Sequence, residues 1–76
     1  MRIEILTPEQ TLFEGEVDSV KFPGIDGEFQ ILNNHAPMIS TLGVGTIVCK
    51  GKEGEKTFDV TSGVAEVLKN KVIVLV

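Results

Sequence analysis

The chain has 76 residues and a formal net charge of −4, with 7 Lys and Arg against 11 Asp and Glu. It has no Trp or Tyr and 4 Phe, so it lacks the cationic and stacking groups on which nucleic-acid binding depends. One Cys excludes an intrachain disulfide, and one Cys with one His excludes the ligand sets of structural zinc sites.

The first third of the chain alternates apolar and polar residues, which is the pattern of half-buried β-strands. Strands are predicted at residues 2–6, 11–14 and 16–22. Pro8 separates the first two, because proline has no N–H for a ladder. In the third, alternation places Val17 on the face opposite Val20 and Phe22.

Residues 7–16 (TPEQTLFEGE) are the only place where a helix could begin. Thr7 could cap it, and Pro8 and Glu9 suit its first turn. Gly15 and the β-branched residues that follow limit such a helix to a short one at best.

The rest of the chain continues the alternation between turn signals such as Pro-Gly and Asp-Gly. Further strands are predicted at residues 28–32, 38–42, 46–50, 55–61, 64–68 and 71–76. No window has a helical period, so about nine short strands must bury their apolar faces against each other. The sequence therefore predicts a single all-β domain over residues 1–76, either a sandwich or a partly open barrel.

An enzyme would have to be built around His35, the only histidine. None of the serines lies in a nucleophile motif. Asp26 and Glu28 flank one glycine and fit a turn and a strand start better than an acid–base pair. Cys49 lies in an alternating run and is predicted to be a small buried hydrophobe. No catalytic residue, metal ligand or cofactor site is predicted.

The loop around His35 is predicted to be stiff. Asn33 and Asn34 tolerate left-handed backbone geometry, and Pro37 biases Ala36 towards an extended conformation. Two interpretations remain open. The His35 ring could cap the turn through a hydrogen bond to backbone, or the apolar run at 36–39 could form an interaction surface.

Residues 27–45 (GEFQILNNHAPMISTLGVG) resemble the G-E-[LF]-x-[IV]-L-x-x-H-A-P-[LM] segment of the epsilon subunit of bacterial F-type ATP synthase. Residues 7–27 resemble the first strands of that family, and residues 61–76 resemble its closing pair. The similarity covers essentially the whole chain. It implies the family's N-terminal domain, a flattened β-sandwich of about ten short, mostly antiparallel strands.

The resemblance also implies a non-catalytic rotor subunit. In this family the domain sits at the foot of the central stalk, binds the gamma subunit and the c-ring, and couples proton or sodium flow to ATP synthesis on other subunits. The implied location is peripheral, on the cytoplasmic face of the bacterial plasma membrane. No stretch approaches the roughly 18 apolar residues of a membrane span, so direct insertion is not expected.

The matching positions give two expected contacts. Glu28 matches the acidic position that faces the polar loops of the c-ring, and His35 matches the histidine on the gamma-facing side. The expected gamma surface continues through Ala36, Pro37, Met38 and Ser40.

The chain also departs from the family. Asn33-Asn34 stands where a Pro-Gly pair is common, and Gln30 where a small residue is common. The chain stops at Val76 without the family's C-terminal helical hairpin, so self-inhibition of ATP hydrolysis is not expected if this is the natural length. The alternative function is a free-standing β-sandwich that binds a peptide or a glycan, although the scarcity of aromatic residues counts against glycan binding.

Overall fold

The computed structural model describes residues 1–76 and contains nine β-strands and no helix. The strands are β1 (Arg2–Leu6), β2 (Thr11–Glu16), β3 (Ser19–Gly24), β4 (Gly27–Leu32), β5 (Met38–Leu42), β6 (Gly45–Gly51), β7 (Gly54–Val60), β8 (Gly63–Leu68) and β9 (Lys71–Leu75). The prediction of an all-β fold is confirmed, with nine strands instead of the ten that the resemblance implied.

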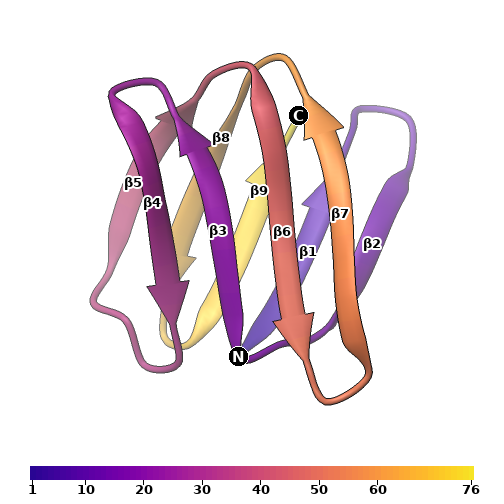
Figure 1. The fold of residues 1–76 in the computed structure, drawn as a ribbon, viewed down its shortest axis with the longest axis vertical. Helices are drawn as coiled ribbons and strands as arrows, with labels where there is room; N and C mark the ends of the chain where they lie inside the picture. Colours follow the sequence, from indigo (N-terminus) through magenta and orange to yellow (C-terminus); the bar gives the residue numbers. More distant parts are fainter.

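One continuous sheet folds over on itself to give two layers (Figure 1). The strand order is β2-β1-β9-β8-β5-β3-β6-β7, and β4 pairs with β3 off this path. The sheet folds over between β5 and β3, which share the single pair Gly24↔Leu42. One layer is therefore β2-β1-β9-β8-β5 and the other is β4-β3-β6-β7. Strands β1 and β9 run parallel, and every other pair is antiparallel.

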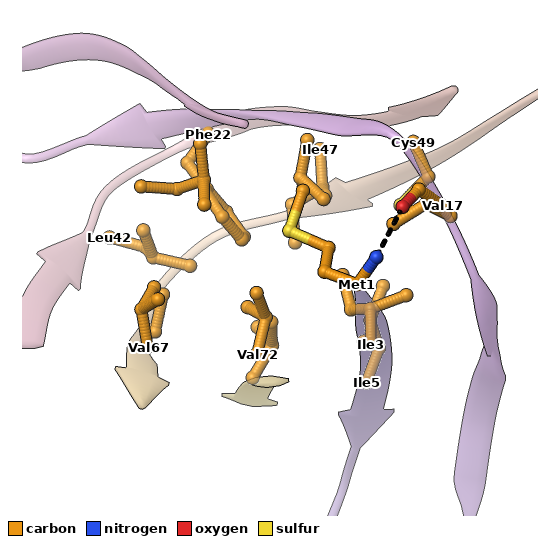
Figure 2. Packing of buried hydrophobic residues seen from close by; sticks show 14 of the residues in the cluster. Met1, Ile3, Ile5, Val17, Phe22, Leu42, Ile47, Cys49, Val67 and Val72 are labelled. Atoms are coloured by element: carbon orange, nitrogen blue, oxygen red, sulfur yellow. Dashed lines mark hydrogen bonds between the residues drawn. The ribbon is translucent and has the colours of Figure 1, made fainter. Parts of the chain in front are cut away.

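The core between the layers consists of 15 buried residues, all of them hydrophobic. Both layers contribute its largest side chains, including Phe22 and Ile47 from one layer and Ile3, Ile5 and Leu42 from the other (Figure 2). Full burial of one such side chain stabilises a fold by about 1.5–3 kcal/mol. Because the chain has no disulfide, this apolar core carries the stability that a small domain needs.

Cys49 belongs to this core, as predicted. Its residue exposure is 2%, and burial raises the pKa of its thiol to about 11. The thiol therefore stays protonated at neutral pH and packs as a small apolar group.

Residues 16–22 do not form the one strand that their alternation predicts. Strand β2 continues to Glu16, and Val17 and Asp18 then separate it from β3. The N–H groups of these two residues bond to carbonyls of other segments at 2.9 and 2.7 Å. The break resets the alternation, so Val17 and Val20 are both buried and do not lie on opposite faces.

The possible helix start at Thr7 is a turn. Thr7 Oγ1 accepts hydrogen bonds from the N–H groups of Glu9 at 3.2 Å and Gln10 at 3.0 Å, as a helix N-cap would. The N–H of Thr7, however, donates to the carbonyl of Gln10 at 2.8 Å. This bond closes the turn and leads the chain into β2. The capping chemistry is present without a helix.

Candidate functional site

The loop between β4 and β5 is fixed to two other parts of the molecule. Asn33 Oδ1 accepts a hydrogen bond from the Met1 amine at 2.7 Å, and the Asn34 N–H donates to Asn70 Oδ1 in the β8–β9 turn at 2.8 Å. Asn34 adopts the left-handed conformation, with φ of 63°. Asparagine tolerates this conformation better than most residues. The two asparagines therefore supply both the turn geometry and its anchors.

The His35 ring bonds to its own loop. Its Nδ1 lies 2.7 Å from the carbonyl oxygen of Ala36, and because a carbonyl can only accept, Nδ1 donates and Nε2 is left as the outer ring nitrogen. The His35 N–H also closes the turn on the carbonyl of Leu32 at 3.2 Å. The structure contains no group of three or more His, Cys, Asp or Glu residues placed to hold a metal. The capping interpretation of His35 agrees with this geometry.

The residues that follow His35 divide between the surface and the interior. Ala36 and Pro37 are exposed, whereas Met38 and Ser40 are half-buried. These last two pair with the buried residues Val67 and Ala65 of β8, so their side chains face the core side of the layer. The outward residue between them is Ile39, which is 68% exposed. Alternation in MISTL around the buried Leu42 could have identified it.

The outer side of the layer β2-β1-β9-β8-β5 carries many apolar side chains, and we call this side the apolar outer face. Its members are Leu6, Leu12, Ile39, Val64, Leu68, Ile73 and Leu75. Ladder pairing joins Leu6, Leu75 and Val64 in one row. In the next row the exposed Glu66 stands between Ile73 and Ile39. Charged side chains border the face, with ion pairs of 3.4 Å between Arg2 and Glu14 and 3.6 Å between Lys71 and Glu4.

This face was not predicted from the sequence. Its signal is that residues 64–68 and 71–76 contain apolar residues at both inward and outward positions. A strand with one solvent-exposed face normally alternates apolar and polar residues. Apolar residues on both sides indicate that something besides the core covers the outer one.

The outer side of the other layer, which we call the polar outer face, has a different composition. It presents Ser19, Lys21, Pro23, Glu28, Gln30, Leu32, Thr46, Val48, Lys50, Glu55, Thr57 and Asp59. Ion pairs join Lys21 to Glu28 at 3.9 Å and Lys50 to Glu55 at 3.6 Å, between side chains that are 44% to 66% exposed. Such pairs stabilise a fold by at most about 1 kcal/mol each.

Glu28 and His35 lie at opposite ends of β4. Glu28 is next to the β3–β4 turn, and His35 lies in the β4–β5 loop at the other end (Figure 1). The Glu28 carboxylate is exposed, and its long contact with Lys21 leaves it accessible. The structure therefore does not bring the two predicted contacts together. It separates them into two surfaces.

These features describe a small β-sandwich domain whose candidate functional residues lie on its surface. The family model described as "ATP synthase, Delta/Epsilon chain, beta-sandwich domain" matches residues 1–76. The chain belongs to this family.

Named relatives agree with the family match. The ATP synthase epsilon chain of Leptospira borgpetersenii serovar Hardjo-bovis is 41% identical over 75 residues, which cover 99% of this chain and 59% of that protein. The ATP synthase epsilon chain of Chlorobium limicola is 40% identical over 75 residues, which cover 97% of this chain and 85% of that protein. The chain therefore spans less than two thirds of the Leptospira protein.

The fold recurs in solved structures. The cryo-EM structure of the central stalk and c-ring of Tetrahymena thermophila mitochondrial ATP synthase contains a chain that matches with a TM-score of 0.82. The sequence identity is 15%, over 97% of this chain and 60% of that chain. At this identity the match establishes a shared fold.

Proposed function

We propose that residues 1–76 form the single β-sandwich domain of a non-catalytic rotor subunit of an F-type ATP synthase. The domain would bind the gamma subunit and the c-ring and couple ion-driven rotation to ATP synthesis elsewhere in the complex. The family match over the whole chain is the observation that carries this proposal. The relatives' common name, ATP synthase epsilon chain, supports it.

The gamma subunit would bind the apolar outer face together with the His35 loop. His35, Ala36 and Pro37 would contact gamma directly, because they lie at the surface of a loop that is anchored at both asparagines. Met38 and Ser40 would support this surface from the core side, and Ile39 would make the side-chain contact along β5. An apolar patch of this extent on a small domain is typical of a protein–protein interface.

The c-ring would meet the opposite end of β4, where Glu28 lies. Its exposed carboxylate suits a basic loop, and its weak ion pair with Lys21 can be exchanged for a partner's cation at little cost. Two partners on two different surfaces of one stiff domain suit a rotor element that turns as a rigid body.

No helix in this structure is long and apolar enough to cross a membrane. We place the domain at the cytoplasmic face of the plasma membrane through its partners, as a peripheral component. The alternative of a glycan-binding module gains no support, because Phe22 is buried and Phe13, Phe29 and Phe58 are half-buried against the core. No aromatic ring is left as an exposed stacking platform.

Co-expression with the cognate gamma subunit, followed by gel filtration, tests the proposal. We expect the two proteins to elute together as one complex, and Ile39→Glu to release the chain while leaving its own fold unchanged. Thr57→Glu on the polar outer face is the matched control and should leave the complex intact. Separate elution of the unmodified chain and gamma would overturn the proposed function.

A further inference from the structure

A single carboxylate stands in the middle of the apolar outer face. Glu66 is exposed on β8, and its ladder partners are Ile73 on β9 and Ile39 on β5. Along its own strand the next residues on the same side are Val64 and Leu68, because side chains two apart in a strand share a face. All four nearest neighbours of Glu66 on this face are therefore apolar.

The other carboxylates of this layer already have cations. The strands of the layer β2-β1-β9-β8-β5 carry four glutamates, and three of them form ion pairs. The pairs are Glu4 with Lys71 at 3.6 Å, Glu14 with Arg2 at 3.4 Å and Glu16 with the Met1 amine at 3.4 Å. The Glu66 side chain takes part in none of the ion pairs or side-chain hydrogen bonds of the structure.

A recess adjoins Glu66 on the apolar outer face. It has a volume of about 260 Å³ and is lined by Glu66, Leu68, Lys69, Lys71 and Ile73. Leu68 and Ile73 give it aliphatic walls, which suit the methylene stem of a lysine or arginine side chain. The Glu66 carboxylate can accept hydrogen bonds from the charged head of such a side chain.

A partner that covers this face would remove water from Glu66. Burial of an ionised carboxylate without a cation is strongly unfavourable, and it offsets what the neighbouring apolar contacts contribute. The nearest cation on an adjacent strand, Lys71, is held by Glu4. A partner that binds here with useful affinity therefore needs a cation of its own opposite Glu66.

We propose that the gamma subunit places one lysine or arginine side chain in this recess, where its cation pairs with Glu66. Apolar contacts are non-directional, so they cannot by themselves fix how gamma lies on the face. The ion pair would fix it, because any other position of gamma leaves both charges buried and unpaired. This inference rests on the proposed function and deepens it by naming the residue that determines the register of the contact.

Isothermal titration with purified gamma tests the proposal through the sign of one effect. Glu66→Leu should weaken binding about tenfold or more, because it leaves the cation of gamma buried against apolar side chains. Without such a cation the same substitution would strengthen binding, because it removes the desolvation cost of the carboxylate. Equal or tighter binding of gamma by Glu66→Leu would therefore contradict the ion pair.

Two further variants control for charge and for added apolar surface. Glu55→Leu makes the same chemical change on the polar outer face and should change gamma affinity by less than about twofold. Glu66→Gln adds no apolar surface and should still weaken binding about threefold or more, because it removes the charge of the pair. Glu66 is exposed and has no partner within the chain, so circular dichroism melting should show both of its variants folded.

An exchange of charges identifies the cation. Glu66→Lys should bind gamma more weakly than Glu66→Leu does, and a gamma variant with one Lys or Arg changed to Glu should restore about tenfold of the lost affinity. Failure of every such gamma variant to restore binding would count against the proposal. Lys69→Met should change affinity by less than about twofold. A loss as large as that of Glu66→Leu would make Lys69 the cation and would remove the role of gamma.

The outcomes separate this inference from the proposed function. If the unmodified chain binds gamma and all Glu66 variants bind it equally well, Glu66 lies outside the contact and only this inference fails. If the unmodified chain does not bind gamma, the ion pair and the proposed function both fail.

Discussion

The two outer faces of the sandwich cover the same core but differ in what they present to water. The polar outer face is a surface that folding alone explains, since most of its side chains are charged or polar and ion pairs of 3.6 and 3.9 Å join four of them. The apolar outer face presents seven Leu, Ile and Val side chains, three of them in one row. Burial in the core cannot account for these residues. This difference between the faces is the reason that we assign the proposed gamma contact to the apolar outer face.

The substitution with the largest expected effect tests whether both layers depend on the same core. Phe22→Ala should destabilise the chain by about 3–5 kcal/mol, because it empties the largest fully buried side-chain site. Urea unfolding followed by circular dichroism should show one transition at lower urea, with both layers lost together. Leu32→Ala at the exposed end of β4 is the control and should cost about 0.5 kcal/mol or less. Persistence of one layer after the other unfolds would contradict a shared core.

A pH titration probes the core beneath the polar outer face. Burial holds the pKa of Cys49 at about 11, above its usual value of 9.0. Between these values the unfolded chain releases a proton that the folded chain keeps, so the thiol's contribution to stability is complete below pH 9.0 and is lost as the pH rises towards 11. The free energy of unfolding of the native chain should therefore fall more steeply across this window than that of Cys49→Ala. Parallel curves for the two proteins would show that Cys49 ionises freely in the folded state.

Ile39→Glu addresses the apolar outer face directly. It should weaken gamma binding about tenfold or more, because a charge would replace an apolar side chain in the proposed interface. The stability of the isolated chain should change by about 1 kcal/mol or less, since the side chain is exposed. Isothermal titration with purified gamma measures the affinity, and Thr57→Glu on the opposite face supplies the comparison. An equal loss of gamma affinity in Ile39→Glu and Thr57→Glu would mean that the two faces do not differ in gamma binding.

The loop beside the apolar outer face should tolerate only particular residues at position 34. Asn34→Ala should destabilise the chain by about 1–2 kcal/mol because alanine is strained at φ of 63°. Asn34→Gly keeps the N–H that bonds to Asn70 and should cost far less. Thermal melting distinguishes the two. An Asn34→Ala protein as stable as Asn34→Gly would mean that the loop is not held in this conformation.

The smallest effect belongs to the polar outer face. Lys21→Met removes the cation that pairs with Glu28 and should change stability by about 0.5 kcal/mol or less. Gamma binding should not change, which differential scanning calorimetry and isothermal titration together can verify. A large loss of stability would show that the 3.9 Å pair matters to the fold.

Most of the strands were predictable from alternation and turn residues, because a period of two and the Gly, Pro and Asn signals are local. The break at Val17 and Asp18 was not, since it depends on hydrogen bonds to other segments of the chain. The helix start at Thr7 was a genuine local signal, but the bond between Thr7 and Gln10 turns the chain into β2 instead.

The candidate surfaces were predictable only in part. The resemblance selected the run from His35 to Ser40, but strand direction decides which of these side chains reach the surface. Met38 and Ser40 face inward, and Ile39 faces outward. The apolar outer face arises because β1, β9, β8 and β5 become neighbours although they are scattered along the sequence. No single segment carries that information.

Hydroxyl-radical footprinting of the chain, alone and bound to gamma, tests the central claim most directly. Oxidation of Ile39, Leu68 and Leu75 should fall sharply in the complex, while oxidation of Leu32 and Val48 on the polar outer face should not change. If Leu32 and Val48 were protected while Ile39 and Leu75 were still oxidised, gamma would bind the polar outer face. That result would contradict the proposed gamma contact on the apolar outer face.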